Sequence, residues 1–268
     1  SYLGSLLGGV FGIIAMNLTG NNYQAVFGWA SIPAIAAILI LIFCVKEPPR
    51  FNHSAIAAQT PMPAPKLKPK FSFKNFKYLG TTFWILMGIN AVYMTARMNE
   101  TFLSIHTNIE FNIDPMLAPI VLICFNFGTA LASYPIGLLG DKLNRVKLLF
   151  LGIIFLILSD IVMYSAVSKT MMYVGIGFWG IQVGVAQNLF ISLIAEKVPE
   201  DLRGTGIGVY WIINAISAFA ADTLAGYVAH NYASSSMFIS SGLIGILSLV
   251  LLTTFINTIS PSSRIRKI

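Results

Sequence analysis

Eight apolar stretches dominate this sequence, and each is long enough to cross the ~30 Å hydrocarbon core of a membrane as a helix. Only 10% of the residues are charged and 56% are hydrophobic, whereas a soluble domain carries about 25% charged residues. A helix satisfies its own backbone hydrogen bonds in lipid, so helices are the expected form of these stretches. We therefore predict an all-α membrane protein with spans at 2–20, 25–45, 79–106, 115–139, 147–167, 171–195, 205–230 and 234–257.

The cations predict how these spans are oriented. The net charge is +7, and 15 of the 17 Lys and Arg residues fall in 46–77, 142–147, 197–203 and 264–267. These segments all lie on one side if the spans simply alternate, and an excess of Lys and Arg marks the cytoplasmic side. We expect both termini to be cytoplasmic. A nucleic-acid surface is not expected, because the cations do not gather on a polar folded domain.

One long polar segment, 46–78, interrupts the apolar spans. It is rich in Pro, Lys and Arg, a composition typical of an extended tether rather than a packed unit. A regulatory element that lies along the membrane surface is the alternative. We expect four regions: two spans in 1–45, a basic cytoplasmic linker at 46–78, a six-helix domain at 79–257 and a cytoplasmic tail at 258–268.

Two short loops carry a distinctive pattern of glycines and charges. GTALASYPIGLLGDKLNRVK places Gly128 and Gly137 nine residues apart, followed by Asp141, Lys142 and Arg145. This pattern resembles the short cytoplasmic loop of the major facilitator superfamily of secondary transporters. It departs at Asn144, where the family has Gly, and at Val146, where the family has a cation. Asn is the least costly replacement, since it also visits the left-handed backbone region.

The second loop, AEKVPEDLRG, resembles another loop of the same family at Glu196, Pro199, Arg203 and Gly204. GSLLGG at 4–9 is similar to a fifth-span motif of that family, with Ser5 in place of Pro. The resemblance implies that the chain covers spans five to twelve of the usual twelve, including a complete C-terminal six-helix bundle. The first four spans would then belong to a preceding segment or to a separate four-span fragment.

The resemblance also implies a function. We expect transport of a small solute by alternating access, as a symporter or uniporter in a bacterial inner membrane, with no cofactor. The alternative is a truncated membrane protein that does not transport, either a remnant or a scaffold. The sequence lacks the motifs of hydrolases, phosphate-binding loops and metal sites, so an enzyme is not expected.

Charged residues in the two loops are candidates for an inner gate. In the family, an Asp and an Arg of the first loop and a Glu and an Arg of the second form a cytoplasmic charge network. The matching residues here are Asp141, Arg145, Glu196 and Arg203, with Lys142 beside them. Carboxylate–guanidinium pairs at helix ends can break when the helices separate. The alternative is that these are ordinary interfacial charges.

Polar residues inside the spans are candidates for the solute path, because they are costly in hydrocarbon and usually face a cavity or a partner. Asn90, Tyr93, Arg97, Glu100 and Ser104 would share one face of a continuous helix. An Arg97–Glu100 pair at the membrane interface is the simpler alternative. Tyr210, Asn214 and Ser217 also share a face. The remaining candidates are Asn126, Gln182 and Asp222.

Two features stay open. Asn126, Thr129, Ser133 and Gly137 form a stripe of small and polar residues, for which close helix packing is the favoured interpretation. Asp160 lies deep within its span and must be either paired or protonated. The sequence offers no partner for it.

Overall fold

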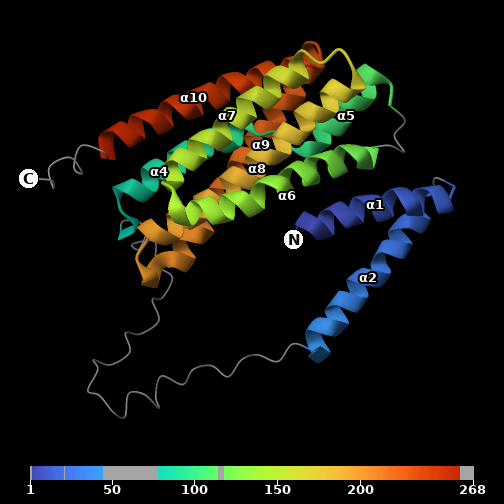
Figure 1. Ribbon diagram of the computed structural model, residues 1–268, viewed down its shortest axis with the longest axis horizontal. Coiled ribbons are helices and arrows are strands. Elements are labelled where there is room, and N and C mark those ends of the chain that lie inside the picture. The colour runs from blue at the N-terminus through green and yellow to red at the C-terminus, as the bar shows by residue number, and fades with distance from the viewer. Residues whose placement is uncertain (1, 21, 45–77, 114–117, 260–268) are drawn as a thin grey trace, which may run out of the picture. The chain divides into compact units, whose positions relative to one another are not determined.

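The computed structural model describes residues 2–20, 22–44, 78–113 and 118–259, and every regular element within them is helical (Figure 1). The all-α membrane fold is confirmed. The elements are α1 (Tyr2–Leu18), α2 (Tyr23–Cys44), α4 (Thr81–Ala96), α5 (Glu100–Phe111), α6 (Ala118–Lys142), α7 (Arg145–Tyr164), α8 (Lys169–Lys197), a 3₁₀ turn η3 (Glu200–Leu202), α9 (Arg203–Asn231) and α10 (Ser236–Ile259). The predicted linker at 46–78 lies, except for Tyr78, outside the described residues, as does the tail beyond Ile259.

The chain divides into two compact units. One comprises Ser1–Phe11 and Lys74–Ile268, and the other comprises Gly12–Phe73. The second unit contains the last part of α1 and all of α2, an apolar helix of 22 residues with Pro33 inside it. The first contains α4 to α10 and all the candidate site residues.

Six of the described helices are long and apolar enough to cross a membrane, namely α2 and α6 to α10. Large apolar side chains such as Phe127, Ile161 and Leu243 are exposed on the surface of the first unit. An apolar outer surface of this extent suits contact with lipid rather than water.

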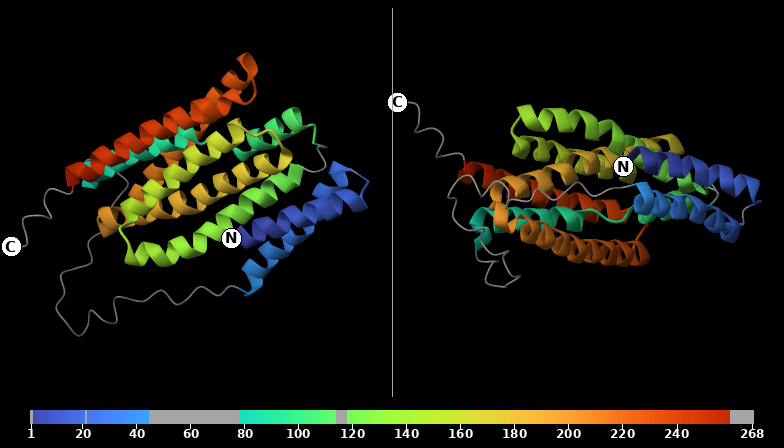
Figure 2. Two further views of the ribbon diagram at one scale, coloured as in Figure 1. Left: turned by 45° about the horizontal axis from the view of Figure 1, so that its top comes forward. Right: turned by 90° about the horizontal axis from the view of Figure 1, so that it is seen from below.

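Helix α8 lies at the centre of the first unit. Helices α6 and α7 pack along it, α10 packs against α7 and α4, and α9 packs against α4 (Figures 1 and 2). Its buried side chains include Ile176, Trp179, Phe190 and Leu193. Gln182 lies in the middle of α8 and is fully buried. Burying a polar side chain without a hydrogen bond is costly, so we expect Gln182 to have a hydrogen-bond partner.

The contact between α6 and α8 depends on the absence of side chains. A Cβ on Gly128 would overlap the carbonyl oxygen of Gly177, and a Cβ on Gly180 would overlap that of Phe125. Thr129 bridges the two backbones, with its Oγ1 3.0 Å from the carbonyl oxygen of Gly180. Small residues permit this close approach of helices in membranes. Around Thr129, the stripe of small and polar residues on α6 is therefore a surface that packs against α8.

The predicted continuous span at 79–106 is wrong, because the helix breaks after Ala96. Arg97 has extended backbone angles (φ −95°, ψ 94°), and α5 begins only at Glu100. Asn99 caps the new helix: its side chain accepts a hydrogen bond of 2.9 Å from the Thr101 amide. Asn is a favoured N-cap residue, and the acidic Glu100 suits the first turn of a helix. The local sequence therefore starts a second helix inside one apolar span.

Candidate functional site

Four uncharged polar side chains meet in the interior of the first unit. Asn90 and Tyr93 come from α4, Gln182 from α8 and Asn214 from α9. The Asn90 amide donates a hydrogen bond of 2.7 Å to Asn214 Oδ1, and the Tyr93 hydroxyl donates one to Gln182 Oε1. All four are at most 6% exposed. We call this set the buried polar cluster.

The buried polar cluster retains unused hydrogen-bonding capacity. Among the described residues, Asn90 Oδ1 and Gln182 Nε2 have no hydrogen-bond partner, although both atoms are buried. The indole Nε1 of Trp179 is in the same condition, one helical turn before Gln182 on α8. Leaving a buried polar group without a hydrogen bond lowers stability by about 1–3 kcal/mol. Such groups therefore usually bond to water or to a ligand, or serve a function.

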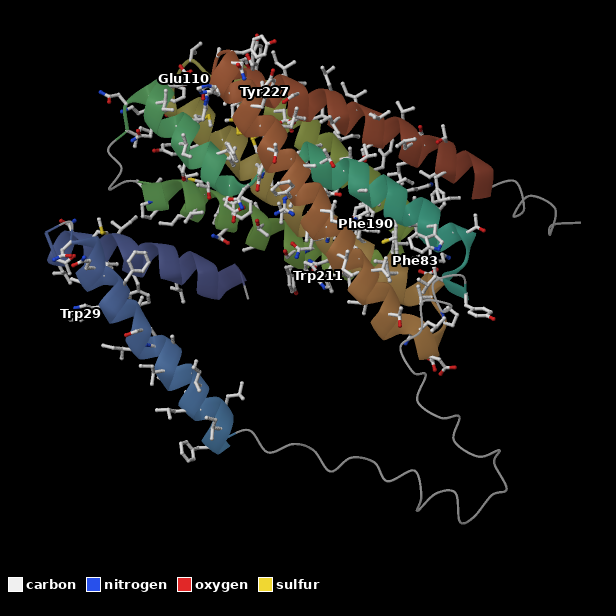
Figure 3. The ribbon with its side chains drawn as sticks, turned by 180° about the vertical axis from the view of Figure 1, so that it is seen from behind. Trp29, Phe83, Glu110, Phe190, Trp211 and Tyr227 are labelled. Carbon is white, nitrogen blue, oxygen red and sulfur yellow. The ribbon has the colours of Figure 1, made fainter. Side chains whose placement is uncertain are left out.

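An aromatic ring packs against the cluster. The ring of Tyr93 lies 5.7 Å from that of Phe190, which is labelled in Figure 3. Tyr210 and Ser217 lie on the same face of α9 as Asn214, and all three are buried. Sequence reasoning missed Trp179; its signal was the spacing of three residues before Gln182, which places both on one side of a helix.

Other candidates for the solute path lie apart from this cluster. Arg97 and Glu100 form no ion pair in the structure as described, because the helix break removes the periodicity that would have brought them together. Asn126 donates to the Leu122 carbonyl of its own helix at 2.8 Å. The Asp222 carboxylate on α9 accepts a hydrogen bond of 2.8 Å from the backbone N–H of Asn99, and thus holds the start of α5.

The two patterned loops meet at one end of the helix bundle. Arg145, the first residue of α7, lies 3.3 Å from the carboxylate of Glu196 near the end of α8, and both side chains are partly exposed. Lys197 also contacts Glu196, at 2.8 Å. The structure therefore places Arg145 and Glu196 together; their role in gating stays a prediction.

Arg203 does not join Glu196 among the recorded ion pairs. Its guanidinium donates to the carbonyl oxygen of Ala195 at 3.0 Å and lies 3.6 Å from Glu200. It thus satisfies a carbonyl in the last turn of α8, where intrahelical donors run out. The side chains of Asp141 and Lys142 lie outside the described residues.

The glycines and Asn144 of the two motifs have different environments. Gly128 sits in the close contact with α8, whereas a Cβ on Gly137 or Gly204 would meet nothing within 4 Å. The expected reason for Asn144 is wrong, since its backbone is extended (φ −64°, ψ 115°) rather than left-handed. Asn144 instead caps α7, accepting a hydrogen bond of 2.9 Å from the Val146 amide.

Known proteins are similar to this chain in sequence. An uncharacterised MFS-type transporter of Methanocaldococcus jannaschii is 21% identical over 84% of this chain and 54% of its own length. The galactose–proton symporter of Escherichia coli K12 is 28% identical over 44% of this chain and 26% of its own. The chain spans about half the length of the first relatives it matches.

A solved structure supports the fold. It is that of a bacterial homologue of the human lysosomal transporter Spinster in an inward-facing, unoccupied conformation. It superposes with a TM-score of 0.53 at 17% identity, and covers 95% of this chain and 66% of that one. The sequence profile described as the Major Facilitator Superfamily matches residues 85–267. The fold, the loop motifs and this match agree: the chain belongs to the major facilitator superfamily, a family of membrane transporters rather than enzymes.

Proposed function

We propose that this chain is the C-terminal part of a secondary transporter that moves a small, polar, uncharged solute by alternating access. The observation that carries the proposal is the buried polar cluster. Hydrogen-bonding side chains on α4, α8 and α9 converge inside an otherwise apolar bundle. Burying such groups in a membrane protein is costly, and they commonly mark the pathway of a substrate.

The chemistry of the cluster indicates the solute class. Asn90, Gln182 and Asn214 supply amides, and Tyr93 supplies a phenol. Such groups bind hydroxyl and amide functions without requiring a charge. The unpartnered Asn90 Oδ1 offers an acceptor, and the unpartnered Gln182 Nε2 offers a donor. Similarity to a galactose–proton symporter agrees with a hydroxyl-rich solute. Transport by either uniport or symport fits the cluster.

The family's transport site lies near the membrane midplane between two halves. The chain would supply spans five to twelve, with the other four contributed by a preceding segment or a separate four-span fragment. Both termini would be cytoplasmic in a bacterial inner membrane. The Arg145–Glu196 pair would close the cytoplasmic side and separate when the helices rock apart.

Uptake into proteoliposomes tests the proposal. The chain is reconstituted alone and together with the four preceding spans, and radiolabelled sugars and other neutral solutes are offered. Gln182→Ala should reduce uptake of the accepted solute by at least tenfold, because it removes a group aimed at that solute. Asn188→Ala is the matched control, since among the described residues its side-chain amide bonds only to the Gly184 carbonyl of the same helix.

The outcomes separate the alternatives. Uptake that requires the four preceding spans and is lost in Gln182→Ala supports the proposal. Equal uptake by Gln182→Ala and Asn188→Ala would show that the cluster is a packing feature. No uptake of any solute by the combined protein would favour the remnant or scaffold.

A further inference from the structure

Asp160 is a buried acid that the proposed transport site does not use. It lies on α7, is 2% exposed, and its carboxylate oxygen Oδ2 is 2.7 Å from the hydroxyl of Ser241 on α10. Among the described residues, its other oxygen, Oδ1, has no partner. The same Ser241 hydroxyl lies 2.7 Å from the carbonyl oxygen of Ala96, the last residue of α4.

Counting hydrogens assigns a proton to this chain of contacts. The Ser241 hydroxyl has one hydrogen, and the Ala96 carbonyl can only accept. If Asp160 were a carboxylate, one of the two short oxygen–oxygen contacts would lack a hydrogen. If Asp160 is a neutral acid, it donates to Ser241, and Ser241 donates to Ala96. Only the neutral form satisfies both contacts.

Within the part of the chain that the structure describes, the surroundings of Asp160 provide no counter-charge. Helix α10 carries no titratable side chain, α4 carries only Tyr93, and α8 carries only Tyr173 between its two ends. On α6, which meets α7 near their shared turn, the described titratable side chains are Cys124 and Tyr134. Arg97 follows Ala96 but forms no recorded ion pair with Asp160, and Tyr164 lines the same surface groove next to Asp160. An unpaired ionised carboxylate here would be very costly.

The contact lies at the helix break. Ala96 ends α4, so its carbonyl oxygen lacks the amide that a continuing helix would supply. Ser241 fills that position from α10. On the other side of the break, Asp222 accepts a hydrogen bond from the backbone N–H of Asn99. Side chains from neighbouring helices thus hold both ends of the break.

We propose that Asp160 is a proton-binding site that controls the break between α4 and α5. With its proton in place, Ser241 donates to Ala96 and fixes the end of α4. When the proton leaves, the carboxylate takes the Ser241 hydrogen bond, Ala96 loses its partner, and the break loosens. The proton itself passes to water. This site stands apart from the buried polar cluster and does not depend on the identity of the transported solute.

Infrared spectroscopy of the full chain in lipid vesicles tests the proton site. The wild type should show the carbonyl band of a protonated carboxylic acid at neutral pH. That band should vanish in Asp160→Asn, whose amide keeps the size of the acid and can donate to Ser241. Asp222→Asn, the matched control, should keep the band. Absence of the band in the wild type, or its persistence in Asp160→Asn, would overturn the proposal.

Hydrogen exchange of a peptide covering 95–101 tests the coupling to the break. At alkaline pH the wild type should exchange roughly fivefold faster than Asp160→Asn at the same pH, the effect expected from losing one hydrogen bond. At acidic pH the two should match. Asp222→Ala should exchange faster at every pH, because it removes the acceptor of the Asn99 backbone N–H. Equal exchange by the wild type and Asp160→Asn across the pH range would refute control of the break.

Discussion

The close contact of α6 with α8 predicts that a single methyl group at Gly180 destabilises the bundle. In Gly180→Ala, the new Cβ would overlap the Phe125 carbonyl oxygen and lie 3.0 Å from the Thr129 amide nitrogen. Both are backbone atoms, so the two helices must separate. Overpacking of this kind costs about 1–3 kcal/mol. Separation also weakens the bond between Thr129 and Gly180, and interhelical bonds in membranes contribute about 0.6 kcal/mol.

Gly177→Ala is the matched control. Gly177 lies one turn earlier on α8, and a Cβ there would meet nothing within 4 Å. Both changes replace a mid-helix Gly by Ala and so gain the same helix propensity, up to ~1 kcal/mol. That gain cancels in the difference between the two variants. We therefore expect Gly180→Ala to be less stable than Gly177→Ala by about 2–4 kcal/mol, from the overpacking and hydrogen-bond terms.

Reversible unfolding in mixed detergent micelles measures this difference. Helical circular dichroism and tryptophan fluorescence, to which the buried Trp179 contributes, should report the same transition. Equal unfolding free energies for Gly180→Ala and Gly177→Ala would refute the close contact of the two helices. A loss in both variants would point to a requirement for Gly along the whole of α8, and would also contradict the argument.

Three further predictions concern single side chains. Asn99→Ala should lower the unfolding free energy by about 1 kcal/mol through loss of the α5 cap, and an unchanged unfolding midpoint would contradict this. Tyr93→Phe should cost about 1–3 kcal/mol in the same titration, because Gln182 Oε1 loses its donor; no loss would show that water replaces the phenol. Arg145→Gln should change the unfolding free energy by less than about 1 kcal/mol, since its ion pair with Glu196 is partly exposed. If the proposed transporter is assembled from this chain and four further spans, the same change should increase labelling of a cysteine placed at the end of the bundle where Arg145 and Glu196 lie. Unchanged labelling would argue against a gate.

The family and the helical architecture follow from the sequence with little ambiguity. Spans predicted at 147–167 and 205–230 appear as α7 (Arg145–Tyr164) and α9 (Arg203–Asn231). The reason is that apolar length is a local property, and lipid leaves the backbone few options besides a helix. The break at Arg97 was missed because Glu100 was interpreted as part of a polar face that lines a path. Asn99 followed by Glu100 is also a helix start signal, and the identity of Glu100 alone does not say which of the two roles it serves.

The sequence by itself determined which residues are polar within each span, but only the tertiary structure decided which of them meet. Tyr93 and Gln182 are 89 positions apart, and Asn90 and Asn214 are 124 apart. Helical periodicity places side chains on a face of their own helix and carries no information about the neighbour across from it. For the same reason the partner of Asp160 was open: Ser241 lies 81 positions away on another helix. The packing of α7 against α10 brings Asp160 and Ser241 together, and that packing depends on the summed contacts of both helix surfaces.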